Sequence, residues 1–151
     1  MASIFSTFLK IELMQTGENA GTWGTKTNTN LQLVEQAIAG YESINVTTTS
    51  VALTMDDGSI SQARNMVLDF AGTLTGGTNV TVPDSVEKMY IVKDSTTHSG
   101  NALTFKTASG SGFNTSEGKI HLAYTNGTNV SNVDLSSLGG QIGTTAIADN
   151  A

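Results

Sequence analysis

Apolar and polar residues alternate in short segments along most of this chain, and Gly, Asn and Pro separate the segments. Alternation over about 4–8 residues is typical of strands that bury one face. We expect strands at residues 43–46, 50–55, 66–70, 79–82, 86–93, 102–106, 119–125 and 128–134. Asn126-Gly127 joins the last two and is a strong hairpin signal. The pattern predicts a mainly β fold, either an antiparallel β-sandwich or an open barrel.

Helical periodicity replaces this alternation in one segment, residues 30–39. Leu31, Val34 and Ile38 share one face of a helix at that spacing, and Thr29 precedes it as a capping residue. A helix of about ten residues is marginal on its own. We therefore expect this face to dock on a sheet.

An apolar arm, residues 1–16, precedes the helix and fits neither period. It is too apolar to be left in water, and its large side chains include Ile4, Phe5, Phe8 and Leu9. The arm is either part of the domain's own core or a segment that docks on a partner subunit.

Residues 17–28 follow as a Gly-rich ordered loop that contains Trp23, the only tryptophan. A Trp in such a loop favours a plug in its own core, and the alternative is an anchor between subunits.

The chain of 151 residues fits one principal domain. Its predicted parts are the arm at 1–16, a β-rich domain with one helix at 17–135, and a C-terminal tail at 136–151 that lacks strong periodicity.

Charge and composition exclude several partners. The net charge is −6, with seven Lys and Arg in total and no basic cluster, so nucleic-acid binding is not expected. There is no cysteine, which excludes disulfides and thiolate metal sites. No apolar run approaches the roughly 20 residues of a membrane helix, and no basic segment precedes an apolar one at the N-terminus. We expect neither a signal peptide nor membrane insertion.

Residues that commonly carry catalysis are few. His98 lies in a polar segment that we interpret as a solvated hairpin loop, and His121 alternates with apolar residues on a predicted strand. The sequence has no nucleophile elbow, phosphate-binding loop, calcium loop or zinc-ligand spacing. We therefore predict no catalytic residue, no cofactor, no metal and no enzymatic activity.

The block that contains Trp23 resembles a segment of structural proteins from tailed bacteriophages, most familiar from tail-fibre-like and other virion surface proteins of marine phages. The resemblance is carried by Gly17-Glu18-Asn19-Ala20-Gly21-Thr22-Trp23-Gly24, Thr27–Leu31 and Glu35–Ile38, and further by Ala63–Asn65, Leu74–Gly76, Val80–Pro83, Lys88–Val92 and Lys106–Gly112. It covers roughly residues 9–130. It implies a non-enzymatic, β-rich component of the virion surface that is made in the host cytoplasm.

The chain is short beside long fibre proteins, which favours a compact self-associating subunit. Candidates are a capsid decoration protein, a head fibre or knob, or a short tail appendage. The resemblance favours a homotrimer bound to phage capsid or tail proteins. The interface residues that we expect are Ile4, Phe5, Phe8, Leu9 and Trp23.

A carbohydrate-binding adhesin module of a tail fibre is the alternative function. Such a module contacts the host surface and needs exposed aromatic side chains. Its candidates in this chain are Trp23, Tyr41, Tyr90 and Tyr124.

Overall fold

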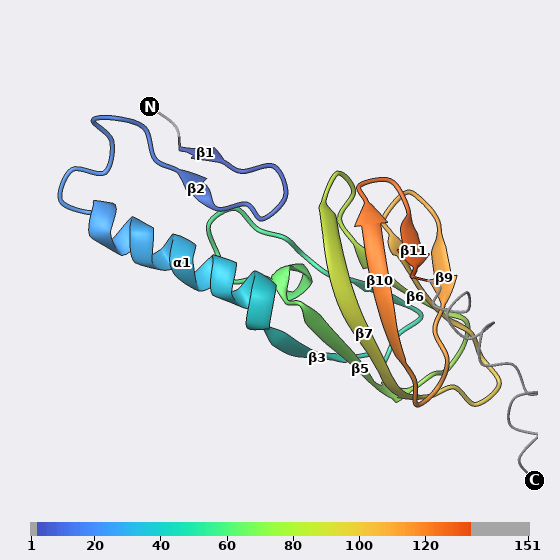
Figure 1. The fold of residues 1–151 in the computed structure, drawn as a ribbon. Helices are drawn as coiled ribbons and strands as arrows, with labels where there is room; N and C mark the ends of the chain where they lie inside the picture. The colour runs from blue at the N-terminus through green and yellow to red at the C-terminus, as the bar shows by residue number, and fades with distance from the viewer. Residues whose placement is uncertain (1–2, 134–151) are drawn as a thin grey trace, which may run out of the picture.

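The computed structural model describes residues 3–133, and the predicted C-terminal tail lies outside the described residues. Two sheets face each other, and one helix and a small hairpin lie together at one end of them (Figure 1). The predicted mainly β fold with one helix is confirmed, and the sheets form a sandwich and not a closed barrel.

The strands of each sheet follow one another in space from edge to edge. The five-stranded sheet contains β11 (Val130–Asn132), β10 (Ile120–Asn126), β7 (Glu87–Thr97), β5 (Val67–Thr73) and β3 (Tyr41–Asn45). The four-stranded sheet contains β4 (Ser50–Ala52), β6 (Thr78–Val82), β8 (Leu103–Thr107) and β9 (Gly112–Asn114). The remaining elements are the hairpin of β1 (Ile4–Phe5) and β2 (Glu12–Leu13), the helix α1 (Trp23–Ala39) and the 3-10 turn η1 (Gln62–Arg64).

Strand direction is where the antiparallel prediction is wrong for half of the sandwich. The chain crosses from the five-stranded to the four-stranded sheet three times, as β3–β4, β5–β6 and β7–β8, and each time it returns to the five-stranded sheet. Parallel neighbours need a crossover between them, and here the crossover runs through the opposite sheet. Tyr41 therefore faces Val67, which faces Ile91, in parallel ladders. Antiparallel pairing joins β7 to β10, β10 to β11 and β8 to β9.

The core lies between the two sheets and centres on Phe105 of β8. Its ring lies 5.7 Å from the rings of both Phe70 and Tyr90 and 6.3 Å from that of Phe113. Tilted and edge-on pairs at such distances are favourable arrangements of aromatic rings. The strict alternation of β7 places Tyr90 in this core and leaves Met89 on the outer face, 47% exposed. The apolar residues on both sides of 86–93 would suit a strand covered on both faces, but only one face of β7 is buried in the described chain.

The predicted hairpin at Asn126-Gly127 is confirmed, and it joins β10 to β11. Only Gly127 has a positive φ, of 84°, so the turn is not type I′, which needs two such residues. The Asn126 carboxamide oxygen accepts hydrogen bonds from the amides of Thr128 and Asn129, at 3.0 and 2.8 Å. A side chain therefore closes this turn.

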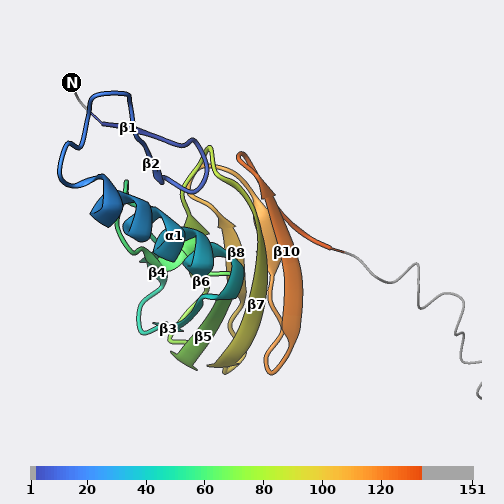
Figure 2. The same cartoon turned by 60° about the vertical axis from the view of Figure 1, so that its left-hand side comes forward.

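The helix α1 is longer than the predicted segment, because it begins at Trp23. Its first turns contain Gly24, Thr25 and Thr27, which are weak helix formers, and Thr22 provides no side-chain cap. Contacts with the β1–β2 hairpin offset this weakness. Figure 2 shows the helix and the hairpin side by side, next to one end of the sandwich.

Candidate assembly surface

The N-terminal arm is a hairpin with one inner and one outer face. Glu12 and Phe5 form one cross-strand pair, and Ile4 and Leu13 form the other. The inner residues are covered, since Glu12 is buried and Phe5 is half-buried. The outer pair is open, with Ile4 49% and Leu13 48% exposed. Of the other predicted interface residues, Phe8 is exposed and Leu9 is half-buried.

Polar groups attach the hairpin to α1. The Glu12 amide donates to Asn30 Oδ1 at 2.9 Å, and Asn30 Nδ2 donates back to the Glu12 carbonyl at 2.7 Å. The Glu12 carboxylate also lies 2.8 Å from Lys26 Nζ. The hydrogen bond from Lys26 is the main reason that the pKa of Glu12 is lowered. The arm is therefore docked on its own chain, although largely through hydrogen bonds and an ion pair.

A fully buried arginine, Arg64, forms a second attachment. Its Nε donates to the Leu9 carbonyl at 2.8 Å, and Nη2 donates to the Asp56 carbonyl at 2.6 Å. Nη1 donates to Ser61 Oγ at 3.1 Å and to the Ser59 carbonyl. No carboxylate accepts from this guanidinium among the bonds described for residues 3–133. Backbone carbonyls from the hairpin and from the loop before η1 thus share one cation.

Two faces of α1 carry apolar residues, and only one holds buried side chains; on the other, Thr27 and Val34 are half-buried and the remaining residues are exposed. The covered face holds Lys26, Asn30, Leu33 and Ala37, of which Leu33 and Ala37 are buried. These four residues are separated by intervals of 4, 3 and 4. A second set of residues has the same intervals but begins one residue later, so it lies about 100° around the helix from the first. We call this set, with Trp23 one turn before it, the helix stripe; it consists of Trp23, Thr27, Leu31, Val34 and Ile38.

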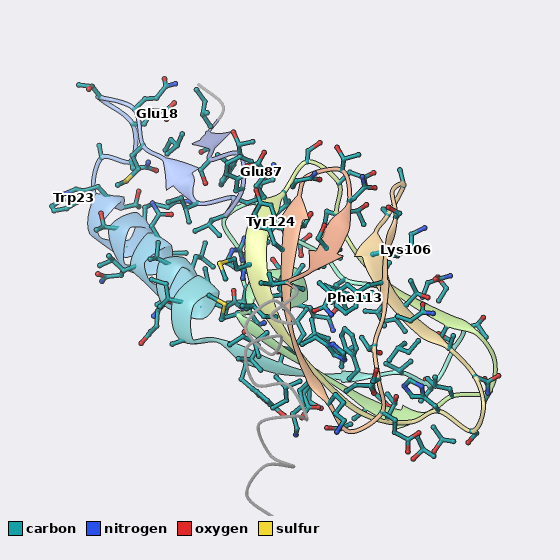
Figure 3. The ribbon with its side chains drawn as sticks, turned by 45° about the vertical axis from the view of Figure 1, so that its right-hand side comes forward. Glu18, Trp23, Glu87, Lys106, Phe113 and Tyr124 are labelled. Carbon is teal, nitrogen blue, oxygen red and sulfur yellow. The ribbon has the colours of Figure 1, made fainter. Side chains whose placement is uncertain are left out.

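The helix stripe overturns two expectations from the sequence. Leu31 and Ile38, which the periodicity predicts to dock on a sheet, are 62% and 68% exposed. Trp23, for which the Gly-rich segment favours a core plug, is 65% exposed and begins the helix. Figure 3 shows its side chain pointing away from the sheets. A signal is present in the sequence, because the apolar residues of 31–38 span more of the helix than one docking face needs.

Further apolar side chains are exposed on the outer face of the five-stranded sheet. Met89 of β7 and Tyr124 of β10 are cross-strand partners, and they are 47% and 40% exposed. On the same face, Tyr41 donates its hydroxyl to Asp69 at 2.6 Å, and Lys93 Nζ lies 2.9 Å from the same carboxylate oxygen. The hydrogen bond to Asp69 is the main reason that the pKa of Tyr41 is raised.

Tyr41 also borders an open hollow of about 340 Å³ at the end of α1. Its ring is 56% exposed, and the hollow's other polar lining residues are Gln32, Glu35, Gln36 and Asn65. Of the other aromatic residues proposed for sugar binding, Tyr90 is fully buried, and its hydroxyl donates to the Ala63 carbonyl at 2.7 Å.

His98 is not the solvated loop histidine that its polar segment predicts. Its Nε2 lies 2.8 Å from Asp94 Oδ2, and its side chain is 16% exposed. Thr115 donates its hydroxyl to the same oxygen at 2.5 Å, so Asp94 lies between the histidine and the hydroxyl. A nucleophile beside a general base needs the hydroxyl on the histidine instead. The cluster therefore orders the end of β7.

His121 fits its predicted place on a strand, half-buried on β10, where Nε2 accepts from the Ser116 amide at 3.0 Å. Within residues 3–133, no group of three or more His, Cys, Asp or Glu side chains is placed to hold a metal ion. In the same part of the chain, no helix has the length and apolarity needed to cross a bilayer.

Comparisons with protein-family models, with curated proteins and with solved structures give no match. The geometry of the exposed surfaces is therefore the structural observation that bears on function.

Proposed function

We propose that this chain is a non-enzymatic structural subunit of a phage particle and that it associates with copies of itself on the virion surface. The observation that carries the proposal is the helix stripe, in which Trp23, Leu31 and Ile38 are each more than 60% exposed. Contiguous apolar patches larger than a few hundred Å² are rare on soluble monomers and mark interaction surfaces. The resemblance of residues 17–38 to phage structural proteins supports the setting, and a homotrimer is the favoured assembly.

The hairpin and α1 bury charged groups and expose apolar ones, and this adds support. Charged groups such as Arg64 and Glu12 are buried and hydrogen-bonded, whereas Ile4, Leu31 and Ile38 face outward. Buried polar pairs fix one geometry of the hairpin on the helix. An assembly surface of defined shape is the result.

Two measurements test this proposal. Light scattering of the purified protein should give a mass of about three times 15.7 kDa, and mass spectrometry of purified particles should detect the chain. A monomer that is absent from particles would refute the proposal. The assignment to the capsid or to the tail then follows from immunogold labelling of intact particles.

The alternative function, a carbohydrate-binding adhesin, is favoured by one observation. Tyr41 presents an exposed ring that is oriented by its bond to Asp69, beside the amides and carboxylate of the hollow at the end of α1. Sugar sites combine such rings with a few polar groups. Binding on a glycan array that is lost in Tyr41→Ala would support this function, and no binding by the native protein would exclude it.

A further inference from the structure

The helix stripe has the spacing of a coiled-coil seam. Thr27, Leu31, Val34 and Ile38 follow one another at intervals of 4, 3 and 4 residues, as the a and d positions of a heptad do. We propose that α1 of one copy packs in parallel and in register against α1 of other copies, so that Leu31 meets Leu31 and Ile38 meets Ile38. This inference rests on the proposed function, in which copies of the chain associate.

The absence of charge on the stripe favours a second copy as its occupant. The chain carries a net charge of −6, so the electrostatic repulsion between two copies is smallest when they meet through faces without charge. None of the five stripe residues is ionisable. The two charged residues of α1 are Lys26, which is paired with Glu12, and Glu35 at the edge of the stripe.

Glu35 distinguishes a parallel arrangement from an antiparallel one. With Leu31 and Ile38 at a positions, Glu35 occupies an e position, and the g positions beside it are Asn30 and Ala37. In a parallel pair, e residues lie next to g residues of the partner, so Glu35 meets uncharged side chains. In an antiparallel pair whose helices cross at Val34, the e position of one helix lies next to the e position of the other. The two Glu35 carboxylates would then repel each other.

The exposed area fits a helix seam that is part of a larger contact. At roughly 150–250 Å² for a large side chain, the exposed fractions of Trp23, Leu31 and Ile38 leave about 300–500 Å² open. A stable interface takes roughly 800 Å² from each partner. The seam thus supplies about half of that area, and Ile4 and Leu13 on the outer face of the hairpin are further candidates.

Single cysteines test the register directly, because the native chain has none. A disulfide requires Cα atoms within about 7 Å. Leu31→Cys and Ile38→Cys should each form a covalent dimer with itself under mild oxidation. The matched controls Gln32→Cys and Ala39→Cys are exposed positions on the other side of α1, and they should not. An antiparallel seam would instead crosslink only a mixture of Leu31→Cys and Ile38→Cys, and that result would overturn the proposal.

A charge placed on the seam provides the second measurement. Leu31→Glu should weaken association at least tenfold in sedimentation experiments, whereas Gln32→Glu should leave it within about twofold. Circular dichroism checks that each variant is folded, which is expected because residue 31 is exposed. Trp23 is the only tryptophan, so its emission should shift to the blue as the native protein assembles and should not shift in Leu31→Glu.

The outcomes separate this inference from the proposed function. An oligomer found on particles that Leu31→Glu leaves intact would overturn the helix seam and keep the structural role. An oligomer that Leu31→Glu dissociates, but that is absent from particles, would support the seam and refute the virion assignment. A native protein that is monomeric at all concentrations would refute both.

Discussion

Removal of the Arg64 side chain should destabilise the protein more than removal of any exposed cation. The guanidinium is fully buried, and burial lowers its pKa. It nevertheless remains charged, because arginine is not deprotonated in proteins. Its hydrogen bonds join the hairpin at Leu9 to the loop before η1, at Asp56, Ser59 and Ser61.

The magnitude follows from the acceptors that Arg64→Ala would leave behind. Three backbone carbonyls lose a charged donor, and hydrogen bonds to charged groups contribute about 1.5–3 kcal/mol each. Water can reach part of the vacated space, and the desolvation cost of the guanidinium is recovered. We therefore expect a loss of about 3–5 kcal/mol, at the upper end for single substitutions and a large part of the roughly 5–15 kcal/mol of a typical domain. Arg64→Lys keeps the charge without the planar fork, so it should lose about half as much.

Urea unfolding followed by far-ultraviolet circular dichroism measures this loss, with Lys119→Ala as the matched control for an exposed cation. The control should stay within about 0.5 kcal/mol of the native protein. Hydrogen exchange should also speed up at the Gly58 amide, which donates to the Lys10 carbonyl at 2.7 Å. If Arg64→Ala unfolded at the same urea concentration as Lys119→Ala, the argument that Arg64 anchors the hairpin would be refuted.

Three further predictions concern the sandwich and the helix. Burial lowers the pKa of Lys88 from 10.5 to about 8, so between these values the native state binds fewer protons than the unfolded state. The free energy of unfolding should therefore rise from pH 8 to pH 10, by at most about 1.4 kcal/mol per pH unit. Urea titrations at several pH values measure this slope, which should be absent in Lys88→Met. Gly112→Ala should lower the melting temperature in calorimetry, because its Cβ would overlap the Phe105 carbonyl, whereas Gly24→Ala in open space should stabilise α1 by about 0.5–1 kcal/mol. Burial alone would raise the pKa of Asp94, but the hydrogen bonds from Thr115, Thr96 and His98 outweigh it, and the pKa is lowered from its ordinary value of 3.8. The stabilisation that the Asp94 carboxylate provides should therefore be lost as the pH falls below 3.8. Urea unfolding at neutral pH should show a loss of about 2–4 kcal/mol in Asp94→Asn.

Local patterns predict the strands well and their directions poorly. The alternation in 86–93 groups Tyr90 with Val92 on one face of a strand, and the structure buries that face, because successive side chains of a strand point to opposite sides whatever its neighbour. Alternation does not distinguish parallel from antiparallel pairing. The switch of sheets after β3, β5 and β7 depends on connections such as 46–49, whose sequence carries no separate signal.

The helix shows why local sequence predicts only part of the assembly surface. Helix propensity predicts that the helix begins no earlier than residue 30, because Gly24 and Thr27 are weak helix formers. Tertiary contacts of Lys26 and Asn30 with Glu12 extend it by two turns. No local pattern contains a contact between residues so far apart in sequence, so the position of Trp23 on the helix is not predictable from the Gly-rich segment around it.

The same contacts explain why an apolar face stays open in a folded chain. The hairpin is held on the Lys26–Asn30 part of the covered face of α1, where the Glu12 carboxylate pairs with Lys26 and the Glu12 backbone forms two hydrogen bonds with the Asn30 side chain. Because these bonds are directional, the hairpin cannot roll around the helix to cover Leu31 and Ile38 without breaking them. Specific polar docking on one face thus preserves an unpartnered seam on the next. Asn30→Leu would remove the two hydrogen bonds to Glu12 but keep its ion pair with Lys26. The weakened hairpin should then cover part of the seam for some of the time, and association measured by sedimentation should fall below that of the native protein.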